Sequence, residues 1–374
     1  MTSRKIRVLV VDDSAIVRRI LSEAVAREPD LEVVGTAPDP FVARDLILRL
    51  KPDVVTLDIE MPRMDGLTFL TKLMQYHPLP VIVVSSVGQS SSEAAIEALR
   101  RGAVEVLAKP SGPYSVGEVS QILAGKIRAA YGARLRKPGE APKAPAVAAP
   151  VARTFPPSSL IAIGASTGGT QAIEDILLQM PEQCPPIVIA QHIPPVFSAS
   201  FASRLNTICK FEVKEAKDGD LVAPGRVLIA PGNFHMLLRR VEGVYKVTVR
   251  DGPRVHYQRP AVDILFQSVA EVGPRNVVGV LLTGMGSDGA AGLLKMRQKG
   301  AATIAQDEAS CVVFGMPKVA IEMGAAEQVL PLSRMGAGIF SALSSRQNRL
   351  SDSQAPVPGR NPAVTQQPES AGLQ

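Results

Sequence analysis

Tryptophan is absent from this 374-residue chain, and aromatic residues make up only 4% of it. Proteins that bind single-stranded nucleic acid stack bases on aromatic rings, and this chain has little material for such a surface. The formal net charge of +6 is modest for this length and does not by itself indicate a nucleic-acid partner. We therefore expect no nucleic-acid binding.

Cysteine is also scarce, because the chain has only three, and they show neither a CxxC pair nor the spacing of zinc ligands. An odd number of widely spaced cysteines forms no disulfide framework. No run of about 18 apolar residues occurs, and the N-terminal residues are polar and basic. These absences predict a reduced, cytoplasmic protein with neither a membrane span nor a cleaved signal peptide.

Two segments differ in composition from the rest of the chain. Residues 136–157 are dominated by proline, alanine and basic residues and show no apolar period, as expected of a linker that cannot bury a core. The end of the chain is polar and contains several prolines. The predicted organisation is a first domain at 4–131, a flexible linker at 132–157, a second domain at 158–344 and a disordered tail at 345–374.

Both predicted domains alternate apolar runs with segments of helical period. In the first, we expect strands at 6–11, 31–37, 54–58, 81–86 and 104–108, and helices at 15–27, 40–50, 67–75, 92–101 and 115–130. In the second, we expect strands at 160–164, 187–191, 227–230, 277–282 and 302–305, helices at 169–179, 197–206, 261–271, 289–299 and 317–323, and an antiparallel hairpin around 245–250. Continuous Val, Ile and Leu runs between helices indicate parallel sheets covered on both faces. The fold class is therefore α/β, with two doubly wound, mostly parallel sheets.

Polar side chains follow the predicted strands of the first domain where each strand ends. Asp12 and Asp13 follow the first strand, and Asp58 ends the third; Ser85 lies at the end of the fourth, and Lys109 follows the fifth. Ligands of open α/β sheets bind at this edge. Converging carboxylates repel each other unless a divalent cation lies between them, and Mg²⁺ suits a few carboxylates with retained water. An aspartate beside Mg²⁺, a hydroxyl and a lysine is equipped to accept a phosphoryl group.

The segments VVDDS, LDIEMPRMDG, VSS and AKP resemble a response-regulator receiver domain, over about residues 4–130. The resemblance implies a flavodoxin-like fold and bound Mg²⁺. The residues it implies are the phosphoacceptor Asp58, the Mg²⁺ ligands Asp12, Asp13 and Asp58, and the phosphoryl contacts Ser85 and Lys109. Receivers commonly carry an aromatic switch residue three positions before the lysine, but Val106 stands there in this chain. We therefore do not expect an aromatic switch.

In the second domain, the first predicted strand runs directly into Gly164-Ala165-Ser166-Thr167-Gly168. This segment fits G-x-S-x-G, in which a serine hydroxyl is exposed on a turn between strand and helix. The alternative is a glycine-rich loop that binds a dinucleotide phosphate at a helix N-terminus. Such a loop requires an acidic residue at the end of the next strand. That strand ends instead in Gln191-His192, and an imidazole suits a serine nucleophile better than a ribose.

A serine nucleophile needs an adjacent base, and the base needs an acid that orients it. His192 ends the strand that follows the one bearing Ser166. His235 and His256 lie near hairpin-like segments and are interpreted as surface or substrate-proximal residues. Cys311 has no base close to it in the sequence and is interpreted as structural.

The candidate acid is Asp288, in the glycine-rich segment TGMGSDG after a later strand. Several glycines in so short a segment suggest a backbone that approaches another group closely, and the N–H groups around Met285 could face a developing oxyanion. No histidine follows Asp288, so the order along the chain must be Ser–His–Asp. This order differs from those of α/β-hydrolases, chymotrypsin and subtilisin.

The segments IGASTGG, IAQHIP, RPAVDILF, LTGMGSDGA and QDEASCVVFGMP resemble the catalytic domain of the CheB family, the chemotaxis protein-glutamate methylesterases. The resemblance implies a Rossmann-like serine hydrolase, without a cofactor in this domain, that demethylates glutamyl methyl esters and deamidates certain glutamines of chemoreceptors. The residues it implies are the nucleophile Ser166, the general base His192 and the orienting acid Asp288, with Thr167, Met285 and Gly286 near the oxyanion or substrate.

The same resemblance implies methyl-accepting chemoreceptors as substrates, a chemotaxis histidine kinase as phosphodonor, and a place beside receptor arrays at the inner membrane without insertion into it. We expect a monomer. We hypothesise that the receiver packs over the cleft of Ser166 and that phosphorylation, which adds about 1.5–2 negative charges, releases it. Two alternatives are a DNA-binding and a nucleotide-binding output domain. No helix-turn-helix or basic recognition helix is evident to support the first.

Overall fold

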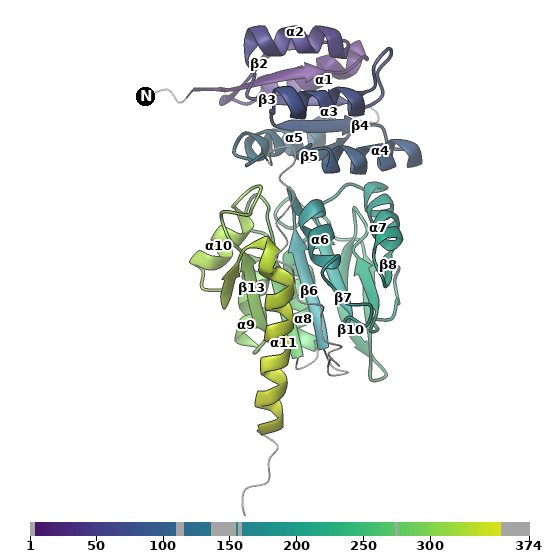
Figure 1. The fold of residues 1–374 in the computed structure, drawn as a ribbon, viewed down its shortest axis with the longest axis vertical. Helices are drawn as coiled ribbons and strands as arrows, with labels where there is room; N and C mark the ends of the chain where they lie inside the picture. The colour runs from purple at the N-terminus through teal and green to yellow at the C-terminus, as the bar shows by residue number, and fades with distance from the viewer. Residues whose placement is uncertain (1–3, 110–115, 136–154, 156–158, 274–275, 353–374) are drawn as a thin grey trace, which may run out of the picture.

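The computed structural model of the chain describes residues 4–109, 116–135, 155, 159–273 and 276–352. Most of the predicted linker at 132–157, and the predicted tail beyond 352, lie outside these residues. The described residues up to 135 form a first unit, and those from 159 onward form a larger second unit directly beneath it in Figure 1.

The first unit is a five-stranded parallel sheet with helices on both faces, in the strand order β2-β1-β3-β4-β5. Its elements are β1 (Ile6–Val11), α1 (Ala15–Ala26), β2 (Leu31–Ala37), α2 (Pro40–Leu50), β3 (Val54–Asp58), α3 (Gly66–Tyr76), β4 (Val81–Ser85), α4 (Gln89–Arg100), β5 (Glu105–Ala108) and α5 (Val116–Tyr131). This order is that of flavodoxin-like folds. The predicted doubly wound fold is confirmed.

The second unit is a seven-stranded parallel sheet in the order β14-β13-β12-β6-β7-β9-β8, with a separate antiparallel hairpin β10-β11. Its elements are β6 (Ser159–Ala165), α6 (Gly169–Leu177), β7 (Ile187–Gln191), α7 (Phe197–Ile208), β8 (Glu212–Glu215), β9 (Arg226–Ile229), β10 (His235–Val241), β11 (Val244–Arg250), α8 (Val262–Val272), β12 (Asn276–Leu281), α9 (Ala290–Gln298), β13 (Ala302–Gln306), α10 (Met316–Glu322), β14 (Gln328–Leu330) and α11 (Met335–Asp352). The predicted strands and helices agree with these bounds within a few residues, and the predicted hairpin is confirmed.

The three central strands of this sheet, β12, β6 and β7, are buried along their whole length. Their Val, Ile and Leu side chains pack on both faces, which is why the sequence shows continuous apolar runs there. Because the three strands are parallel and adjacent, their carboxyl ends lie at one edge of the sheet. In Figure 1 this edge faces the first unit.

Three elements of the second unit were not predicted: β8, β14 and α11. The two strands lie at opposite edges of the sheet, where half-exposed polar residues interrupt the apolar pattern. Helix α11 buries Met335, Ile339 and Leu343, which are four residues apart and share one helix face. It continues to Asp352, so the disordered tail predicted from Ser345 begins too early. The hydroxyl of Ser345 donates to the carbonyl of Ala342, and this segment continues the helix rather than starting the tail.

Side-chain contacts join the two units. Helix α4 packs on α7, and Arg100 of α4 lies 3.8 Å from Glu174 of α6. Past the end of α5, Arg134 donates to the backbone carbonyl of Glu308 at 2.7 Å. The units are therefore docked through helices on one side and through the residues that follow α5 on the other.

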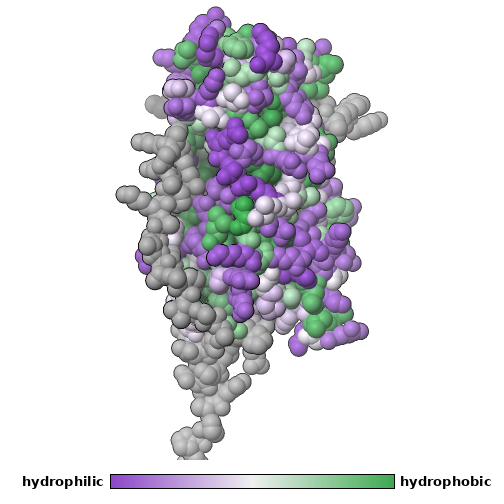
Figure 2. All heavy atoms as spheres, turned by 45° about the vertical axis from the view of Figure 1, so that its right-hand side comes forward, coloured by the Kyte–Doolittle hydropathy of each residue, from purple (hydrophilic) through white to green (hydrophobic). Residues whose placement is uncertain are grey.

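The outer surface is mixed in character. On the face drawn in Figure 2, hydrophilic and hydrophobic side chains are interspersed over both units. Among the described residues, no helix combines the length and the apolar character needed to cross a bilayer.

Candidate active site and phosphoryl site

Ser166 lies directly after β6, on the turn that leads into α6. Its backbone is held from both neighbouring strands: the Ser166 N–H donates to the carbonyl of Thr283, and its carbonyl accepts from the Nε2 of Gln191 at 2.9 Å. Gly168 adopts φ +77°, a left-handed conformation that glycine tolerates, and this reverses the chain into the helix. The strand, turn and helix predicted from G-x-S-x-G are present.

Gly284 passes close behind Ser166. A Cβ added at Gly284 would lie 2.6 Å from the Cβ of Ser166 and 2.4 Å from the Sδ of Met316, well inside van der Waals contact. The glycine therefore lets the loop after β12 approach the serine. This is the close approach that the glycine-rich segment TGMGSDG suggested.

Replacing Gly284 with alanine is expected to lower ester hydrolysis by about 100-fold, because a displacement of about 1 Å at a reacting group has that effect. Methanol release and a thermal melt of the purified variant would measure activity and folding separately. The control is Gly88→Ala, where the nearest atom to the added methyl group is the Ser91 Oγ at 3.6 Å. Full activity in a folded Gly284→Ala variant would show that the serine tolerates the displacement.

His192 and Asp288 meet at this edge of the sheet. The Nε2 of His192 lies 2.7 Å from the Oδ2 of Asp288, and both side chains are almost completely buried. His192 directly follows β7, and Asp288 lies between β12 and α9. The two residues are therefore brought together with Ser166 from three adjacent strands.

The other ring nitrogen of His192, Nδ1, is buried and has no hydrogen-bond partner among the described residues. Since Nε2 faces Asp288, Nδ1 is the ring nitrogen that this carboxylate does not engage. The sequence did not indicate which of the two nitrogens would face the carboxylate.

Asp288 is held as an anion. Burial raises its pKa, but the hydrogen bond and charge of His192, together with backbone N–H groups, outweigh burial and leave the pKa below its usual value. The N–H groups of Val262 and Asp263 donate to its two oxygens at 2.7 and 2.9 Å. A carboxylate fixed in this way can orient an imidazole and stabilise its protonated form.

Two backbone N–H groups beside the cavity that Ser166 lines have no carbonyl partner among the described residues. In the described chain, no carbonyl accepts a hydrogen bond from the N–H of Thr167 or of Met285. Both residues line a cavity together with Ser166 and His192, and Gly286 lies beside them. The N–H groups of Thr167 and Met285 are therefore the candidates for an oxyanion site in this cavity.

The interpretation of His235 as a surface or substrate-proximal residue is wrong. His235 is 3% exposed, its Nε2 lies 2.9 Å from the carbonyl of Pro253, and its Nδ1 accepts from the N–H of Ala261. It is a structural histidine that holds the segment before α8. His256, by contrast, lines the cavity of Ser166. Cys311 is buried, and burial raises the pKa of its thiol to about 12.

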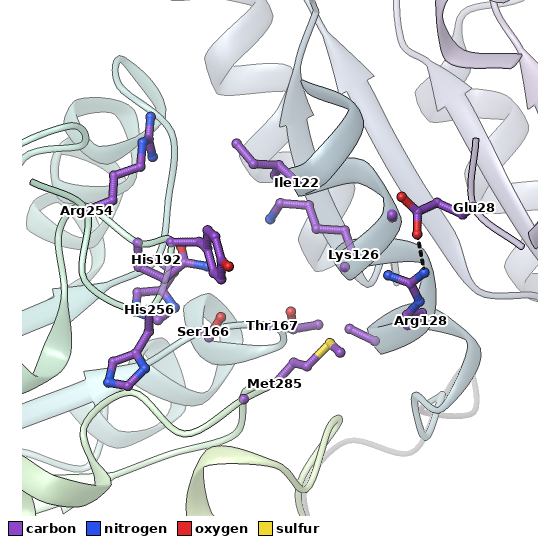
Figure 3. A pocket seen from close by; sticks show the side chains of 16 residues that line it. Glu28, Ile122, Lys126, Arg128, Ser166, Thr167, His192, Arg254, His256 and Met285 are labelled. Atoms are coloured by element: carbon purple, nitrogen blue, oxygen red, sulfur yellow. Dashed lines mark hydrogen bonds and ion pairs between the residues drawn. The ribbon is translucent and has the colours of Figure 1, made fainter. Parts of the chain in front are cut away.

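The cavity of about 530 Å³ lies between the two units. In Figure 3, Ile122, Lys126 and Arg128 of α5 stand on one side, and His192, Arg254 and His256 stand on the other. Ser166 and Thr167 lie between these groups, and Ser166 is 8% exposed. The first unit therefore forms one wall of the cavity that holds the candidate nucleophile.

A direct hydrogen bond also crosses between the units. Thr167, the residue after the serine, donates from its hydroxyl to the Oε2 of Glu105 on β5 at 2.7 Å. The other oxygen of Glu105 lies 3.1 Å from the Nζ of Lys126. Glu105 was not predicted as a site residue, because an acidic residue inside a predicted strand gives no sign of a partner in another domain.

The polar residues of the first unit converge as predicted. Asp12, Asp13 and Asp58 each place a carboxylate oxygen within 4.8 Å of the others. The Nζ of Lys109 lies 2.7 Å from Asp58 and 3.1 Å from Asp12. The contact with Asp12 is made by its Oδ2, and the side chains of Asp12 and Asp58 are both fully buried. An oxygen-only set of three converging carboxylates, two of them buried, fits Mg²⁺.

The charges at this edge are strongly coupled. Burial raises the pKa of Asp58 to about 6, with a further contribution from Asp12, while Lys109 opposes the shift. Burial likewise raises the pKa of Asp12. For Lys109, burial alone lowers the pKa, but the hydrogen bond to Asp58 and the charges of both aspartates leave it raised. The site is short of positive charge, as expected of one that takes a divalent cation.

Ser85, at the end of β4, and Val106, on β5, are both buried. The Ser85 hydroxyl donates to the carbonyl of Ser91 in α4 at 3.3 Å. Glu60, two residues after Asp58, accepts hydrogen bonds from the hydroxyls of Ser86 and Ser91. The carboxylate cluster is thus linked to the start of α4 through these side chains, with a buried valine at the position of the expected aromatic switch.

The fold and the two sites define a class of protein: a receiver-type domain with converging aspartates, joined to an α/β domain with a buried Ser, His and Asp. A family model described as response regulator receiver domain matches residues 8–118, and one described as CheB methylesterase matches residues 161–339. The chain belongs to the CheB methylesterase family. The match places the second domain in that family rather than in either alternative class of output domain.

Several relatives are similar over nearly their whole length. A protein of Syntrophus aciditrophicus named protein-glutamate methylesterase/protein-glutamine glutaminase 2 is 56% identical over 330 residues, which are 88% of this chain and 96% of the relative. A protein-glutamate methylesterase/protein-glutamine glutaminase of Salmonella typhi is 51% identical over 92% of this chain and 98% of the relative. Among solved structures, the CheB methylesterase catalytic domain of Thermotoga maritima is 41% identical, with a TM-score of 0.48, over 49% of this chain and 97% of that domain.

Proposed function

We propose that this protein hydrolyses glutamyl methyl esters on methyl-accepting chemoreceptors, and deamidates certain of their glutamines, with Ser166 as nucleophile, His192 as general base and Asp288 as orienting acid. The observation that carries the proposal is the buried 2.7 Å contact between His192 and Asp288, in the cavity that Ser166 lines. Relatives that carry the protein-glutamate methylesterase/protein-glutamine glutaminase name support the choice of ester and amide.

The first half of the reaction transfers the acyl group to the enzyme. The Nδ1 of His192 takes the proton of Ser166 as its oxygen attacks the ester carbonyl, and the carboxylate of Asp288 stabilises the resulting imidazolium. The N–H groups of Thr167 and Met285 bind the oxyanion of the tetrahedral intermediate. The intermediate then breaks its bond to the methoxy oxygen, which takes the proton from His192 and leaves as methanol.

In the second half, His192 takes a proton from water as the water attacks the acyl-enzyme. The bond to the Ser166 oxygen breaks, the serine takes the proton back, and glutamate is released. Deamidation follows the same course, with ammonia leaving in place of methanol. Every step uses the same imidazole and the same oxyanion site, so one cavity serves both substrates.

In the first unit, Asp58 is the proposed phosphoacceptor. Asp12, Asp13 and Asp58 would hold Mg²⁺, which neutralises charge on the transferred phosphoryl group when it is bound. Lys109 pairs with a phosphoryl oxygen, and the hydroxyl of Ser85 donates to another. A chemotaxis histidine kinase is the proposed phosphodonor.

The docked receiver is proposed to restrict the substrate. A helix with its side chains is about 10–12 Å across, and a receptor presents its glutamyl esters on such helices. The cavity above Ser166 is about 530 Å³ and is walled by α5 of the receiver. We propose that phosphorylation of Asp58 weakens the docking and admits the receptor.

Glu105→Ala should raise the basal activity of the unphosphorylated protein about tenfold. The variant loses the hydrogen bond from Thr167, and a bond to a charged group contributes about 1.5–3 kcal/mol, whereas about 1.4 kcal/mol already changes an equilibrium tenfold. Methanol release without a phosphodonor measures the effect. Glu32→Ala, at a carboxylate that lies 3.5 Å from Arg7 within the receiver, is the matched control. Unchanged basal activity in Glu105→Ala would show that this bond does not hold the docked form.

We further propose the domain bounds stated above, with the catalytic domain now including α11, a cytoplasmic location beside receptor arrays, and a monomeric state without nucleic-acid partners. The test of the proposed function is methanol release from methylated receptor fragments, with and without a small phosphodonor. Wild type should release methanol faster with the phosphodonor, and Asp58→Ala should not respond to it. No methanol from wild type under either condition would overturn the proposed function.

A further inference from the structure

Asp263 lies behind the catalytic carboxylate and contacts it directly. It is in the first turn of α8, is 3% exposed, and donates its backbone N–H to the Oδ1 of Asp288 at 2.9 Å. Its Oδ1 accepts from the N–H of Gly292 at 2.6 Å, and its Oδ2 lies 3.1 Å from the Nε2 of His256. Asp263 belongs to the segment RPAVDILF, to which the proposed reaction gives no role.

The contact with Gly292 fixes the loop that carries Asp288. Gly292 is in the first turn of α9, which starts two residues after Asp288. A Cβ at Gly292 would lie 2.7 Å from the Cβ of Phe266 and 3.0 Å from the Oδ1 of Asp263, so only glycine lets the helices approach this closely. Asp263 therefore connects the first turn of α8, which donates an N–H to Asp288, to the first turn of α9, which follows Asp288 in the chain.

The charge of Asp263 depends on its partners. Burial and the nearby Asp288 raise its pKa, while the N–H of Gly292 and the imidazole of His256 lower it, and the net direction is upward. Oxygens of Asp263 and Asp288 and a nitrogen of His256 lie within 4.8 Å of one another. Two buried carboxylates this close disfavour each other's charge unless a donor compensates.

We propose that Asp263 is a positioning residue of the esterase reaction: it holds Asp288 in place, its negative charge adds to that of Asp288 at the base His192, and His256 keeps it ionised. This inference rests on the proposed roles of Ser166, His192 and Asp288. The site thus contains two His–Asp pairs, His192 with Asp288 and His256 with Asp263. They are joined by the N–H that Asp263 donates to Asp288.

Other charged groups line the same cavity as His256. Besides Asp263 on α8, it shares the cavity with His192 after β7, with Arg254 four residues after β11, and with Lys126 and Arg128 of α5. Glu28 of the first unit also lines this cavity and pairs with Arg128. His256 is half-exposed and accessible to these groups, whereas Asp263 is buried and contacts Asp288 directly. The test therefore centres on Asp263.

The experiment uses the full-length protein and a small activated ester as substrate, with kcat and KM measured from pH 5 to pH 9. Asn is nearly isosteric with Asp and keeps an oxygen for Gly292, but it removes the charge. With one negative charge fewer near the imidazolium, Asp263→Asn should move the acid limb of kcat/KM down by about one pH unit and lower kcat about tenfold. KM should change less than kcat, because Asp263 does not touch the substrate.

Two variants at His256 test the second half of the proposal. His256→Leu leaves the Oδ2 of Asp263 without its partner, while Oδ1 keeps the N–H of Gly292, and it should change the profile in the same direction as Asp263→Asn. His256→Gln supplies an amide donor and should restore most of the wild-type profile. The control is Asp220→Asn, since Asp220 also pairs with a backbone N–H and a lysine, but in the turn between β8 and β9.

The outcomes separate this inference from the proposed function. An Asp263→Asn variant that folds and retains the wild-type kcat and pH profile would reduce Asp263 to a helix cap and overturn the inference. Identical profiles for the Leu and Gln variants of His256 would overturn the role of His256. If wild type neither hydrolyses the ester nor reacts at Ser166 with a fluorophosphonate probe, the proposed function itself fails.

Discussion

Ser166→Ala is expected to lower methyl-ester hydrolysis by about 10⁶-fold while leaving the fold intact. The hydroxyl is the proposed nucleophile, and removal of the nucleophile from a serine hydrolase eliminates the covalent route entirely. Folding should be preserved because the turn is held by the backbone of Ser166, through Thr283 and Gln191, rather than by its hydroxyl. Methanol release and circular dichroism measure the two properties.

The residual rate in Ser166→Ala is informative. Binding and the N–H groups of Thr167 and Met285 remain, and such groups alone accelerate hydrolysis about 10³–10⁴-fold over water. Ser198→Ala is a suitable control, since Ser198 is a buried serine of α7 that bonds to Glu215 and lies outside the cavity. Turnover near the wild-type rate in Ser166→Ala would remove this serine from the mechanism.

Asp288→Asn is expected to lower kcat about 10⁴-fold, with a much smaller change in KM. An amide in this position no longer stabilises the imidazolium of His192, and loss of the orienting carboxylate has an effect of this size in serine hydrolases. The two oxygens of Asp288 accept the backbone N–H groups of Val262 and Asp263. In asparagine an NH₂ group replaces one of these oxygens, so that one of the two N–H donors faces another donor. The imidazole is then free to turn or to adopt the other tautomer.

Steady-state kinetics between pH 6 and pH 9 would measure this loss, and a thermal melt would show whether the loop stays folded. Asp218→Asn is the matched control, because its carboxylate also accepts a backbone N–H, from Val249, but lies on the exposed hairpin side. Comparable kcat values for wild type and Asp288→Asn would contradict the orienting role. They would also leave the buried contact with His192 without a catalytic reason.

These predictions depend on residues that the sequence placed at strand ends. Ser166, His192 and Asp288 were found because each follows a continuous apolar run, and parallel strands end at a common edge. Asp12, Asp58 and Lys109 were found in the same way. The prediction that His192 follows the strand beside that of Ser166 is confirmed by the pairing of β6 with β7.

Other residues of the two sites carried no such local signal. Glu105 meets Thr167 across 62 residues of sequence, and nothing near either one indicates the other. His256 and Asp263 are seven residues apart, but their importance comes from a contact with Asp288, which is distant in sequence. His235 was misread because burial of a polar side chain depends on what packs over its strand.

The amino-acid sequence by itself determined the strands, the helices between them and the polar residues at the strand ends, because these follow from local hydrophobic periodicity and backbone preference. Only the tertiary structure decided which nitrogen of His192 faces Asp288, that the receiver forms a wall of the cavity of Ser166, and that Asp263 contacts Asp288. Those facts depend on contacts between side chains that are far apart in the sequence. Such contacts are determined by the packing of the whole molecule rather than by any local sequence pattern.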